Sequence, residues 1–507
     1  MFCWAGSESK KSTIKNMEIL KNYIKGHWME SKEKECIDVL NPANQEVLAR
    51  VPYGAGTAQD TEDAIAAAGE AITEWSRVPV MQRVQALYKL KSLLEANKEE
   101  IARLISLECG KSFAEAVAEM QRGIENVETA CATPTLMQSE FSENIASGID
   151  EFMIRQPVGI CACISPFNFP GMIPFWFLPY AIACGNSFIL KPSEKVPLTM
   201  MKVFELIDRL DLPVGLVNLV HGGKESVDTL LDHSEVKAIS FVGSTSVARY
   251  IYQRGAANGK RVQAQGGAKN PVIIMPDADI EMTARIIADS VYGCAGQRCL
   301  AASNIVTVGD ANGLMKEALI EAAKNKVTGF GLDEGVEMGP VITPESKSRV
   351  EKLIELGLAE GAKLLLDGRG ASIAGFEKGN FIKPTILENV ALDGELIGTE
   401  IFGPVMSLLP MDKLDQAIDF VNGNTYGNMA CLFTSSGQNA RTFRNRANAG
   451  NIGINIGVAA PMAQFPFSGW NDSFFGDLHG QGRHAIEFFT QTKVVIERWP
   501  KEWTRKF

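Results

Sequence analysis

The sequence predicts an α/β protein with two doubly wound α/β domains and a small β element that we expect to serve oligomerisation. Three observations lead to this prediction. The chain has 507 residues, which exceeds what one hydrophobic core usually covers. Short apolar runs alternate with segments of helical periodicity, a pattern typical of doubly wound sheets. Two further strand-like segments, residues 149–157 and the C-terminal EFFTQTKVVIERW, lead out of the predicted domains.

The first predicted domain comprises residues 17–141 and 160–268. Its N-terminal part, residues 60–130, has apolar residues at helical spacing and polar residues on the opposite faces. Short apolar runs then follow, and each leads through a turn into a helical segment. The buried strands are expected at residues 158–164, 187–190, 216–220 and 238–242.

The second predicted domain covers residues 269–480. It starts with the apolar run PVIIM, continues through the helical segment DIEMTARIIADSVYG and reaches GCAGQRCLA. Residues 142–159 and 481–507 are expected to form the bridging β element, because strands that leave their domain can pair with another subunit. Residues 1–16 precede a second methionine and are expected to be a disordered extension.

Composition and charge exclude several classes of protein. Hydrophobic residues make up 46% and charged residues 22% of the chain, as in ordinary globular proteins. The net charge of −10 provides no basic surface for nucleic acid or an anionic membrane. The ten cysteines form no CxxC pair and the five histidines are scattered, so no metal site is expected.

The sequence predicts a cytoplasmic location. The N-terminus has no apolar core long enough for a signal peptide. The most apolar stretch, PFWFLPYAIAC, is too short to cross a bilayer, and we expect it to form a buried helix. Many free thiols also suit a reducing compartment.

Two predicted strands end in groups that suit a nucleotide. The run SFIL leads into Lys191 and Glu194, at the edge of the sheet where α/β proteins bind ligands. The run AISFV leads into Gly243 and Ser244 and then into a helix, whose N-terminus attracts phosphate. Taken alone, each segment is as consistent with an ordinary strand-to-helix turn or N-cap. No GxGxxG follows a strand, so the usual dinucleotide fingerprint is absent.

The segment GCAGQRCLA provides the best setting for a reactive cysteine. A catalytic thiol needs access, positive surroundings and backbone donors, and a turn of small residues that enters a helix provides them. Cys299 meets these conditions best, and Cys294 is its nearest competitor. Cysteines in apolar runs are expected to pack in the core instead; these are Cys161, Cys163 and Cys184.

Two polar residues could act with such a thiol. Asn168 lies in SPFNFP at the end of the first strand, where its amide could donate to an oxyanion. The alternative for Asn168 is a turn residue before Phe-Pro. Glu400 opens EIFGPV, and its alternative is a solvated acid beside a Gly-Pro turn.

Six ordered motifs resemble the aldehyde dehydrogenase superfamily from about residue 20 to about residue 500: PFNFP, FILKPSE, SFVGST, GAKN, GQRC followed by LA, and EIFGPV. The resemblance implies an aldehyde dehydrogenase-like fold whose first domain binds NAD and whose second domain is catalytic. It also implies that Cys299 attacks the aldehyde and that Asn168 holds the oxyanion. The residues implied to bind NAD are Ser165, Phe167, Lys191, Glu194, Lys195, Gly243, Ser244, Glu400 and Phe402.

Within the superfamily, GQRC, QGGAKNPVIIMPDAD and the C-terminal INIGVAAPMAQFPFSGWNDSFFGDLHGQG resemble the CoA-acylating branch that oxidises methylmalonate semialdehyde. Hydrolytic members carry a glutamate four residues before the lysine of their GGK motif. Here that position is Gln265, and a glutamine cannot act as the base that activates water. The resemblance therefore implies CoA as the co-substrate that accepts the acyl group. The chain departs from the branch at Lys195, where arginine is common, and at residues 265 and 266, where Asn or Thr is usual.

The implied substrate is a small anionic semialdehyde, methylmalonate or malonate semialdehyde. Its oxidation with NAD would give propionyl-CoA or acetyl-CoA with loss of CO2. Arg298 adjoins the nucleophile, and Arg122 stands where the resembling family has a substrate-carboxylate arginine. A guanidinium suits a carboxylate geometrically. The alternative for Arg122 is a solvated helix charge paired with a glutamate.

Two other functions stay open. One is a CoA-independent, NAD-dependent dehydrogenase of another anionic aldehyde, such as a sulfonated or phosphorylated one, that gives the free acid. The other is a non-catalytic structural protein with a dehydrogenase fold, which a lost nucleophile or oxyanion donor would indicate. We expect a homodimer or homotetramer. NAD should be preferred over NADP, because Glu194 would repel a 2′-phosphate.

Overall fold

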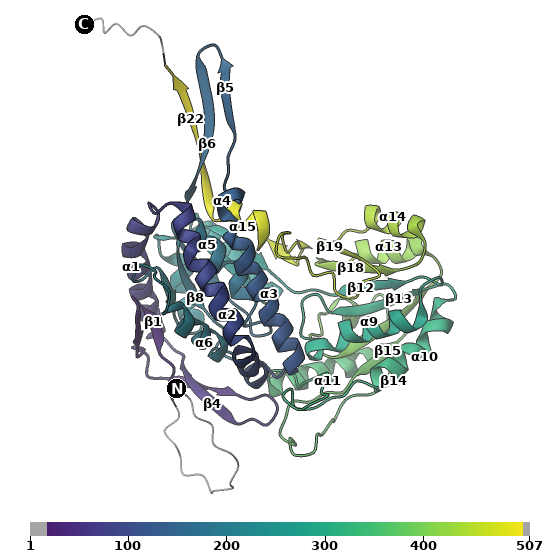
Figure 1. Cartoon of the computed structure of the whole chain (residues 1–507). Coiled ribbons are helices and arrows are strands. Elements are labelled where there is room, and N and C mark those ends of the chain that lie inside the picture. The colour runs from purple at the N-terminus through teal and green to yellow at the C-terminus, as the bar shows by residue number, and fades with distance from the viewer. Residues whose placement is uncertain (1–17, 500–507) are drawn as a thin grey trace, which may run out of the picture.

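The computed structural model of this chain describes residues 18–499, which form two α/β lobes and a projecting arm of strands (Figure 1). The predicted α/β class, with two sheets flanked by helices and small β elements, is confirmed. The predicted extension, residues 1–16, lies outside the described residues. Within residues 18–499, no helix is both long enough and apolar enough to cross a membrane.

The first lobe is built on an eight-stranded sheet in the order β2-β1-β9-β8-β7-β10-β11-β21. The five strands from β9 to β11 are parallel, and their order reverses beside β7, as in dinucleotide-binding sheets. Ligands bind at such a reversal, outside the carboxyl ends of the strands. The strands are β1 (Asn22–Ile24), β2 (His27–Met29), β7 (Ile160–Ile164), β8 (Ser187–Lys191), β9 (Val217–Leu219), β10 (Val236–Val242), β11 (Arg261–Gln265) and β21 (Phe474–Phe475).

Successive side chains of β7 point to opposite faces of this sheet, and both faces are buried. Ile160 and Ala162 pack in one cluster with helices α1, α7 and α8, whereas Cys161 and Cys163 pack in the other with α2, α3, α5 and α6. Both faces are covered, so the strands consist of continuous apolar runs. The helices are α1 (Thr57–Trp75), α2 (Val80–Cys109), α3 (Phe113–Cys131), α4 (Thr133–Leu136), η1 (Ile173–Trp176), α5 (Leu178–Ala183), α6 (Leu198–Ile207), α7 (Lys224–Asp232) and α8 (Thr245–Ala257).

The second lobe is built on a seven-stranded sheet in the order β14-β15-β16-β13-β12-β18-β19, parallel except for β14. Its strands are β12 (Asn270–Ile274), β13 (Ala302–Val308), β14 (Lys363–Leu366), β15 (Thr385–Glu388), β16 (Val405–Met411), β18 (Met429–Phe433) and β19 (Asn451–Ile454). Its helices are α9 (Ile280–Tyr292), η2 (Gly293–Gly296), α10 (Ala311–Lys324), α11 (Pro344–Ala359), α12 (Glu395–Gly398), α13 (Leu414–Asn422) and α14 (Gly437–Arg446).

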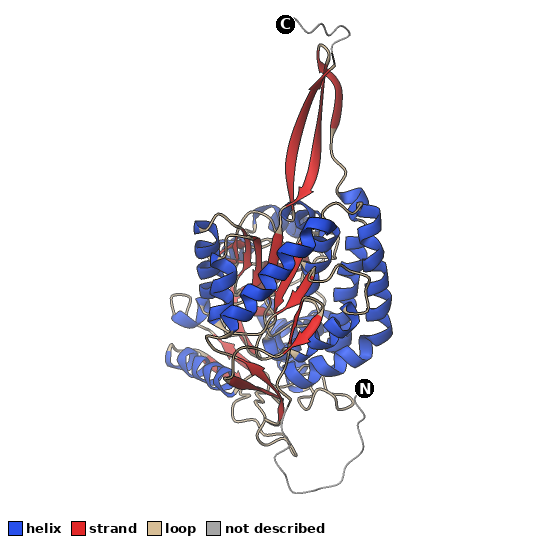
Figure 2. Cartoon of the chain, turned by 90° about the vertical axis from the view of Figure 1, so that its left-hand side faces the viewer, coloured by secondary structure: helices blue, strands red, loops and turns tan. Residues whose placement is uncertain are grey.

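The projecting arm is a separate three-stranded sheet, β22-β6-β5, that extends away from the helices (Figure 2). Strand β22 (Thr490–Arg498) pairs antiparallel with β6 (Ile149–Pro157) along its whole length, and β5 (Phe141–Ala146) flanks β6. The remaining elements are β3 (Cys36–Leu40), β4 (Val47–Pro52), β17 (Tyr426–Gly427), β20 (Trp470–Asn471) and α15 (Gly482–Phe488).

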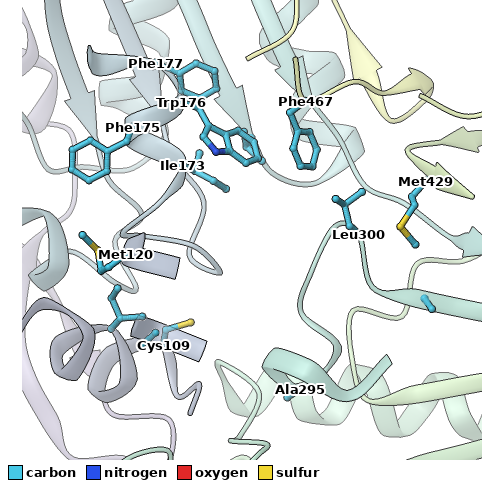
Figure 3. Packing of buried hydrophobic residues seen from close by; sticks show 14 of the residues in the cluster. Cys109, Met120, Ile173, Phe175, Trp176, Phe177, Ala295, Leu300, Met429 and Phe467 are labelled. Carbon is cyan, nitrogen blue, oxygen red and sulfur yellow. The ribbon is translucent and has the colours of Figure 1, made fainter. Parts of the chain in front are cut away.

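One hydrophobic cluster runs through both lobes and joins them. The predicted buried segment PFWFLPYAIAC forms η1 and α5 and lies within this cluster. Trp176 of η1 stacks on Phe467, with ring centroids 4.5 Å apart, and Leu300 lies near Phe467 on the second-lobe side (Figure 3). The two lobes therefore meet across packed side chains beside the segment that carries Cys299.

Candidate active site

The segment between α9 and β13 turns sharply before it reaches Cys299. Cys294 and Ala295 both adopt left-handed backbone conformations, with φ of 52° and 51°, and Gly296 follows with φ of 73°. A Cβ at Gly296 would lie 2.1 Å from the carbonyl oxygen of Gly403. Glycine is therefore required where this turn approaches the EIFGPV segment.

Two asparagines hold the backbone of Cys299 from the second lobe. The side-chain amides of Asn270 and Asn428 donate to its carbonyl oxygen at 2.8 and 2.9 Å. Cys299 is partly buried and lines the cavity between the lobes. Burial, and then the charge of Glu400, raises the pKa of its thiol to about 12, although hydrogen bonds to the sulfur act in the opposite direction. The thiol is therefore protonated at neutral pH and must lose its proton before or during attack.

Asn168 follows β7 and reaches the same segment from the first lobe. Its side chain is buried, and its amide donates to the carbonyl oxygen of Gln297 at 2.8 Å. This bond places the amide beside the backbone that leads into Cys299. When an aldehyde adds to the Cys299 sulfur, its oxygen becomes negatively charged. The second N–H of such an amide, together with the backbone N–H of Cys299, could stabilise this oxyanion. The structure thus brings the predicted nucleophile and the predicted oxyanion donor to one place.

The carboxyl end of β8 carries a charged pair that suits a ribose. The ammonium nitrogen of Lys191 lies 3.3 Å from a carboxylate oxygen of Glu194, and the N–H of Ser165 donates to the carbonyl oxygen of Lys191. Although burial acts in the opposite direction, Lys191 lowers the pKa of Glu194, which is therefore an ionised acceptor at neutral pH. The ammonium of Lys195 lies 5.5 Å from the ring centroid of Phe167. These five residues line one edge of the switch point.

The N-terminus of α8 lies on the other side of that switch point. Ser244 is its N-cap residue, and its side chain makes no capping hydrogen bond. The preceding Gly243 donates to the carbonyl oxygen of Gln265, which fixes the turn next to β11. The first amides of α8 thus lack a side-chain acceptor, and they could hold a phosphate group of a dinucleotide.

Glu400 and Phe402 belong to the second lobe and contact the predicted cofactor region of the first lobe. Glu400 accepts the N–H of Ala268 at 2.8 Å, and burial raises the pKa of its carboxyl. Phe402 has a left-handed backbone, with φ of 53°, and its ring meets the Phe167 ring edge to face at 5.9 Å between centroids. Behind Glu400, burial lowers the pKa of Lys269 to about 7, and its side-chain nitrogen has no hydrogen-bond partner among residues 18–499. The predicted cofactor residues thus come from both lobes, and the contact between Phe167 and Phe402 brings the two groups together.

A cavity of about 230 Å³ leads to Cys299 between α3 and the second lobe. Its lining is mainly apolar, with Trp176 and Phe467 among its walls, and its charged lining residues are Lys111, Glu115, Glu119, Arg122 and Arg298. Arg122 pairs with Glu125 at 3.1 Å and is partly exposed, whereas Arg298 pairs with Glu115 at 2.5 Å. The cavity could therefore take a small aldehyde with an anionic end.

Gln265 ends β11 and is buried close to this cavity. Its amide nitrogen donates to the carbonyl oxygen of Phe467 at 3.2 Å. The side chain is therefore engaged as a donor, and an amide has no useful basicity near neutral pH.

Several residues that hold the site together were not predicted from the sequence. They are Asn270 and Asn428, which fix the nucleophile backbone, and Lys111, Glu115 and Glu119, which contact the loops around it. Asn270 belongs to the GAKN motif, so its position was a usable signal. The other four carry no local pattern, because each acts on a segment far away in the sequence.

Known proteins match this chain over nearly its whole length. The family model "Aldehyde dehydrogenase family" matches residues 28–495. Malonate-semialdehyde dehydrogenase 1 of Geobacillus thermodenitrificans is 48% identical over 484 residues, which is 95% of this chain and 99% of the relative.

Two crystal structures also superpose on nearly the whole chain. One is described as a methylmalonate-semialdehyde dehydrogenase from Sinorhizobium meliloti 1021 complexed with NAD, and the other is methylmalonate-semialdehyde dehydrogenase from Oceanimonas doudoroffii. Each has a TM-score of 0.94 and 40% identity, and each match covers 96% of this chain and 99% of the known one.

Proposed function

The chain belongs to the aldehyde dehydrogenase family, and from that premise we propose that it oxidises malonate or methylmalonate semialdehyde with NAD and coenzyme A. The acyl group forms a thioester on Cys299 and leaves as acetyl-CoA or propionyl-CoA, with loss of CO2. The observation that carries the proposal is the placement of Cys299 and two arginines on one small cavity, with the Asn168 amide bonded to the backbone segment that leads into Cys299. The relatives named for these semialdehydes support the substrate class.

The proposed chemistry begins at Cys299. Its thiolate adds to the aldehyde carbon, and the Asn168 amide and the Cys299 N–H hold the oxyanion of the adduct. The chemistry that NAD supplies when bound is acceptance of a hydride, which leaves an acyl thioester on the sulfur. A carboxylate β to that thioester can leave as CO2, because the same donors stabilise the enolate, which then takes up a proton. For malonate semialdehyde the balance is semialdehyde, NAD+ and CoA to acetyl-CoA, CO2 and NADH.

The cofactor residues fit NAD. We propose that Lys191 and Glu194 hold the adenosine ribose and that the N-terminus of α8, with Gly243 and Ser244, holds the pyrophosphate. Ser165, Phe167, Lys195 and Phe402 would line the remaining walls, and Glu400 would face the nicotinamide ribose. The ionised Glu194 would repel a 2′-phosphate, which favours NAD over NADP.

The projecting arm supports an oligomer. Its strands expose large apolar side chains, which monomeric proteins rarely display together; these include Phe141, Ile154, Val494 and Ile496. Strand β22 is also an edge strand, with backbone groups free to pair with another chain. We therefore propose a homodimer or homotetramer in which this arm contacts a second copy.

Coenzyme A should be needed for fast turnover. Gln265 cannot activate water, whereas a thiol is a few per cent thiolate near pH 7 and attacks a thioester without that base. With NAD and malonate semialdehyde but no thiol, we expect a burst of one NADH per active site and then a slow steady state. Adding CoA should raise the steady rate at least about tenfold, with acyl-CoA formed in step with NADH. Stopped-flow absorbance and chromatography measure both.

The matched variant for this experiment is Gln265→Glu, which restores a carboxylate at the position of the missing base. Its steady rate without CoA should rise above that of the unchanged protein. The proposal would be wrong if the unchanged protein turned over rapidly without any thiol and released the free acid. In that case the CoA-independent alternative would take its place.

Arg122→Ala should weaken the use of an anionic aldehyde selectively. Arg122 lines the cavity, and a charge-assisted hydrogen bond contributes about 1.5–3 kcal/mol, so kcat/KM for malonate semialdehyde should fall roughly 10- to 100-fold. Propanal, which has no anion, should be used almost as well as before. Glu125→Gln is the control: it removes the competing partner of Arg122 and should not raise KM for the anionic aldehyde. Equal losses with both aldehydes would contradict anion recognition by Arg122.

A further inference from the structure

Helix α3 contacts both loops that carry the reacting groups. It lies on the side of the first lobe that faces the second lobe (Figure 1). Glu115 and Glu119 are four residues apart on this helix, so their side chains lie on one face, separated by about 6 Å along the axis. Glu119 contacts the loop that carries Asn168, and Glu115 contacts the turn that leads to Cys299.

The Glu119 contact involves a fully buried ion pair. The ammonium of Lys111 lies 2.5 Å from Glu119, and the two side chains are 1% and 0% exposed. Lys111 also donates to the carbonyl oxygen of Asn168 at 2.7 Å, and the N–H of Gly171 donates to Glu119 at 2.6 Å. The Phe169 ring packs against the same ammonium, 3.9 Å from its centroid. The pair thus binds both ends of the loop from Asn168 to Gly171.

The charge of Lys111 is maintained in this buried position. Burial lowers the pKa of its ammonium, but charge interactions with the neighbouring Cys294 and Glu119 side chains outweigh burial and raise that pKa above its usual value. A buried ion pair is usually not the most stable choice, because desolvation costs several kcal/mol per ion and apolar residues often replace such a pair without loss. A role in fixing the geometry of the loop accounts for its presence.

The Glu115 contact binds both ends of the nucleophile turn. One carboxylate oxygen accepts the N–H of Cys294 at 2.7 Å and the guanidinium of Arg298 at 2.5 Å. The other accepts the N–H and hydroxyl of Ser112, the N-cap residue of α3, in a capping box. Two successive non-glycine residues with positive φ, at Cys294 and Ala295, persist only when surrounding contacts hold them. Glu115 provides such a contact from a rigid helix.

From these contacts we propose that α3 is the spacer that sets the distance between the two halves of the oxyanion site. The proposal rests on the function proposed above. Lys111 and Glu119 hold the Asn168 half, and Glu115 holds the Cys299 half. Oxyanion donors act only within about 2.7–3.1 Å of the developing charge. The loop from Asn168 to Gly171 contains no helix or strand among the described residues, and the nucleophile turn contains only the short η2 with left-handed residues inside it, so α3 supplies the rigidity. These are positioning residues, which act through Asn168 and Cys299.

Lys111→Met is the primary test, because it keeps a long apolar stem but removes every donor. The rate constant of the NADH burst, measured without CoA, should fall about 30- to 100-fold, somewhat less than for removal of an oxyanion donor. NAD affinity should stay within about twofold, and so should the alkylation rate of Cys299 by iodoacetamide, followed by peptide mass spectrometry. Neither readout requires an oxyanion. Glu119→Gln is the second variant if Lys111→Met does not fold.

A double-mutant cycle with Asn168→Ala separates positioning from stability. If Lys111 acts through Asn168, adding Lys111→Met to the Asn168→Ala variant should lower the burst rate constant by less than about threefold. Lys316→Met is the matched control, since it removes an ion pair with Glu388 at 2.6 Å on α10 and β15 of the second lobe. It should lower Tm without changing the burst. Equal losses of burst rate from Lys111→Met in both backgrounds would overturn the proposal, and so would a loss of burst rate in Lys316→Met as large as that in Lys111→Met.

Glu115→Ala tests the other half of the spacer. It releases the nucleophile turn, so both the burst rate and the alkylation rate of Cys299 should fall, in contrast to Lys111→Met. If Glu115→Ala left both rates unchanged, the spacer role would be wrong. Absence of any burst in the unchanged protein would instead contradict the proposed thioester route, so the two failures are distinguishable.

Discussion

Cys299→Ala is expected to abolish NADH formation from any aldehyde while leaving NAD binding intact. Loss of a covalent nucleophile lowers kcat by roughly 10⁵-fold or more. Cys299 is partly buried and its backbone is held by Asn270 and Asn428, contacts that the substitution does not touch. The variant should therefore fold normally. Stopped-flow detection of the NADH burst and calorimetric titration with NAD measure the two effects.

Cys294→Ala is the matched control for the nucleophile. Cys294 is the competing cysteine of the same segment, lines the same cavity and has a left-handed backbone that alanine tolerates as well as cysteine does. This variant should keep the burst. Substantial turnover by Cys299→Ala, or an acyl group found on Cys294, would contradict the assignment of the nucleophile.

Asn168→Ala is expected to lower the burst rate constant about 10²- to 10³-fold, the usual effect of removing one oxyanion donor. The reason is that the Asn168 amide is buried beside the segment that enters Cys299, where it is anchored by its bond to Gln297. KM should change little, because the amide is needed chiefly after the oxyanion forms. Single-turnover stopped-flow measurements separate these two effects.

Asn186→Ala is the control for loss of a buried asparagine. The Asn186 amide donates to the carbonyl oxygens of Ala181 and Phe489, and its oxygen accepts the N–H of Gly159. Removing it should lower Tm but leave the burst unchanged. If both asparagine variants reduced the burst equally, the role of Asn168 would be structural.

Much of the fold could be predicted because burial imposes a local pattern. The runs VGICACI, SFIL and AISFV form β7, β8 and β10, since strands covered on both faces must be apolar throughout. The motif residues at their ends lie at one edge of the sheet, because the carboxyl ends of parallel strands share an edge. Periodicity did not indicate the small strands β1, β2 and β21, which extend the sheet as antiparallel edges.

The sequence by itself determined where the buried strands of the first sheet lie and which residue types stand at the strand ends. Only the tertiary structure decided which distant groups meet. Asn168 bonds to Gln297 across 129 positions, and Glu115 pairs with Arg298 across 183. The physical reason is that the burial of a strand or helix face repeats every few residues and leaves a readable period. A contact between two loops leaves no period, because it depends on how α3 packs between the lobes.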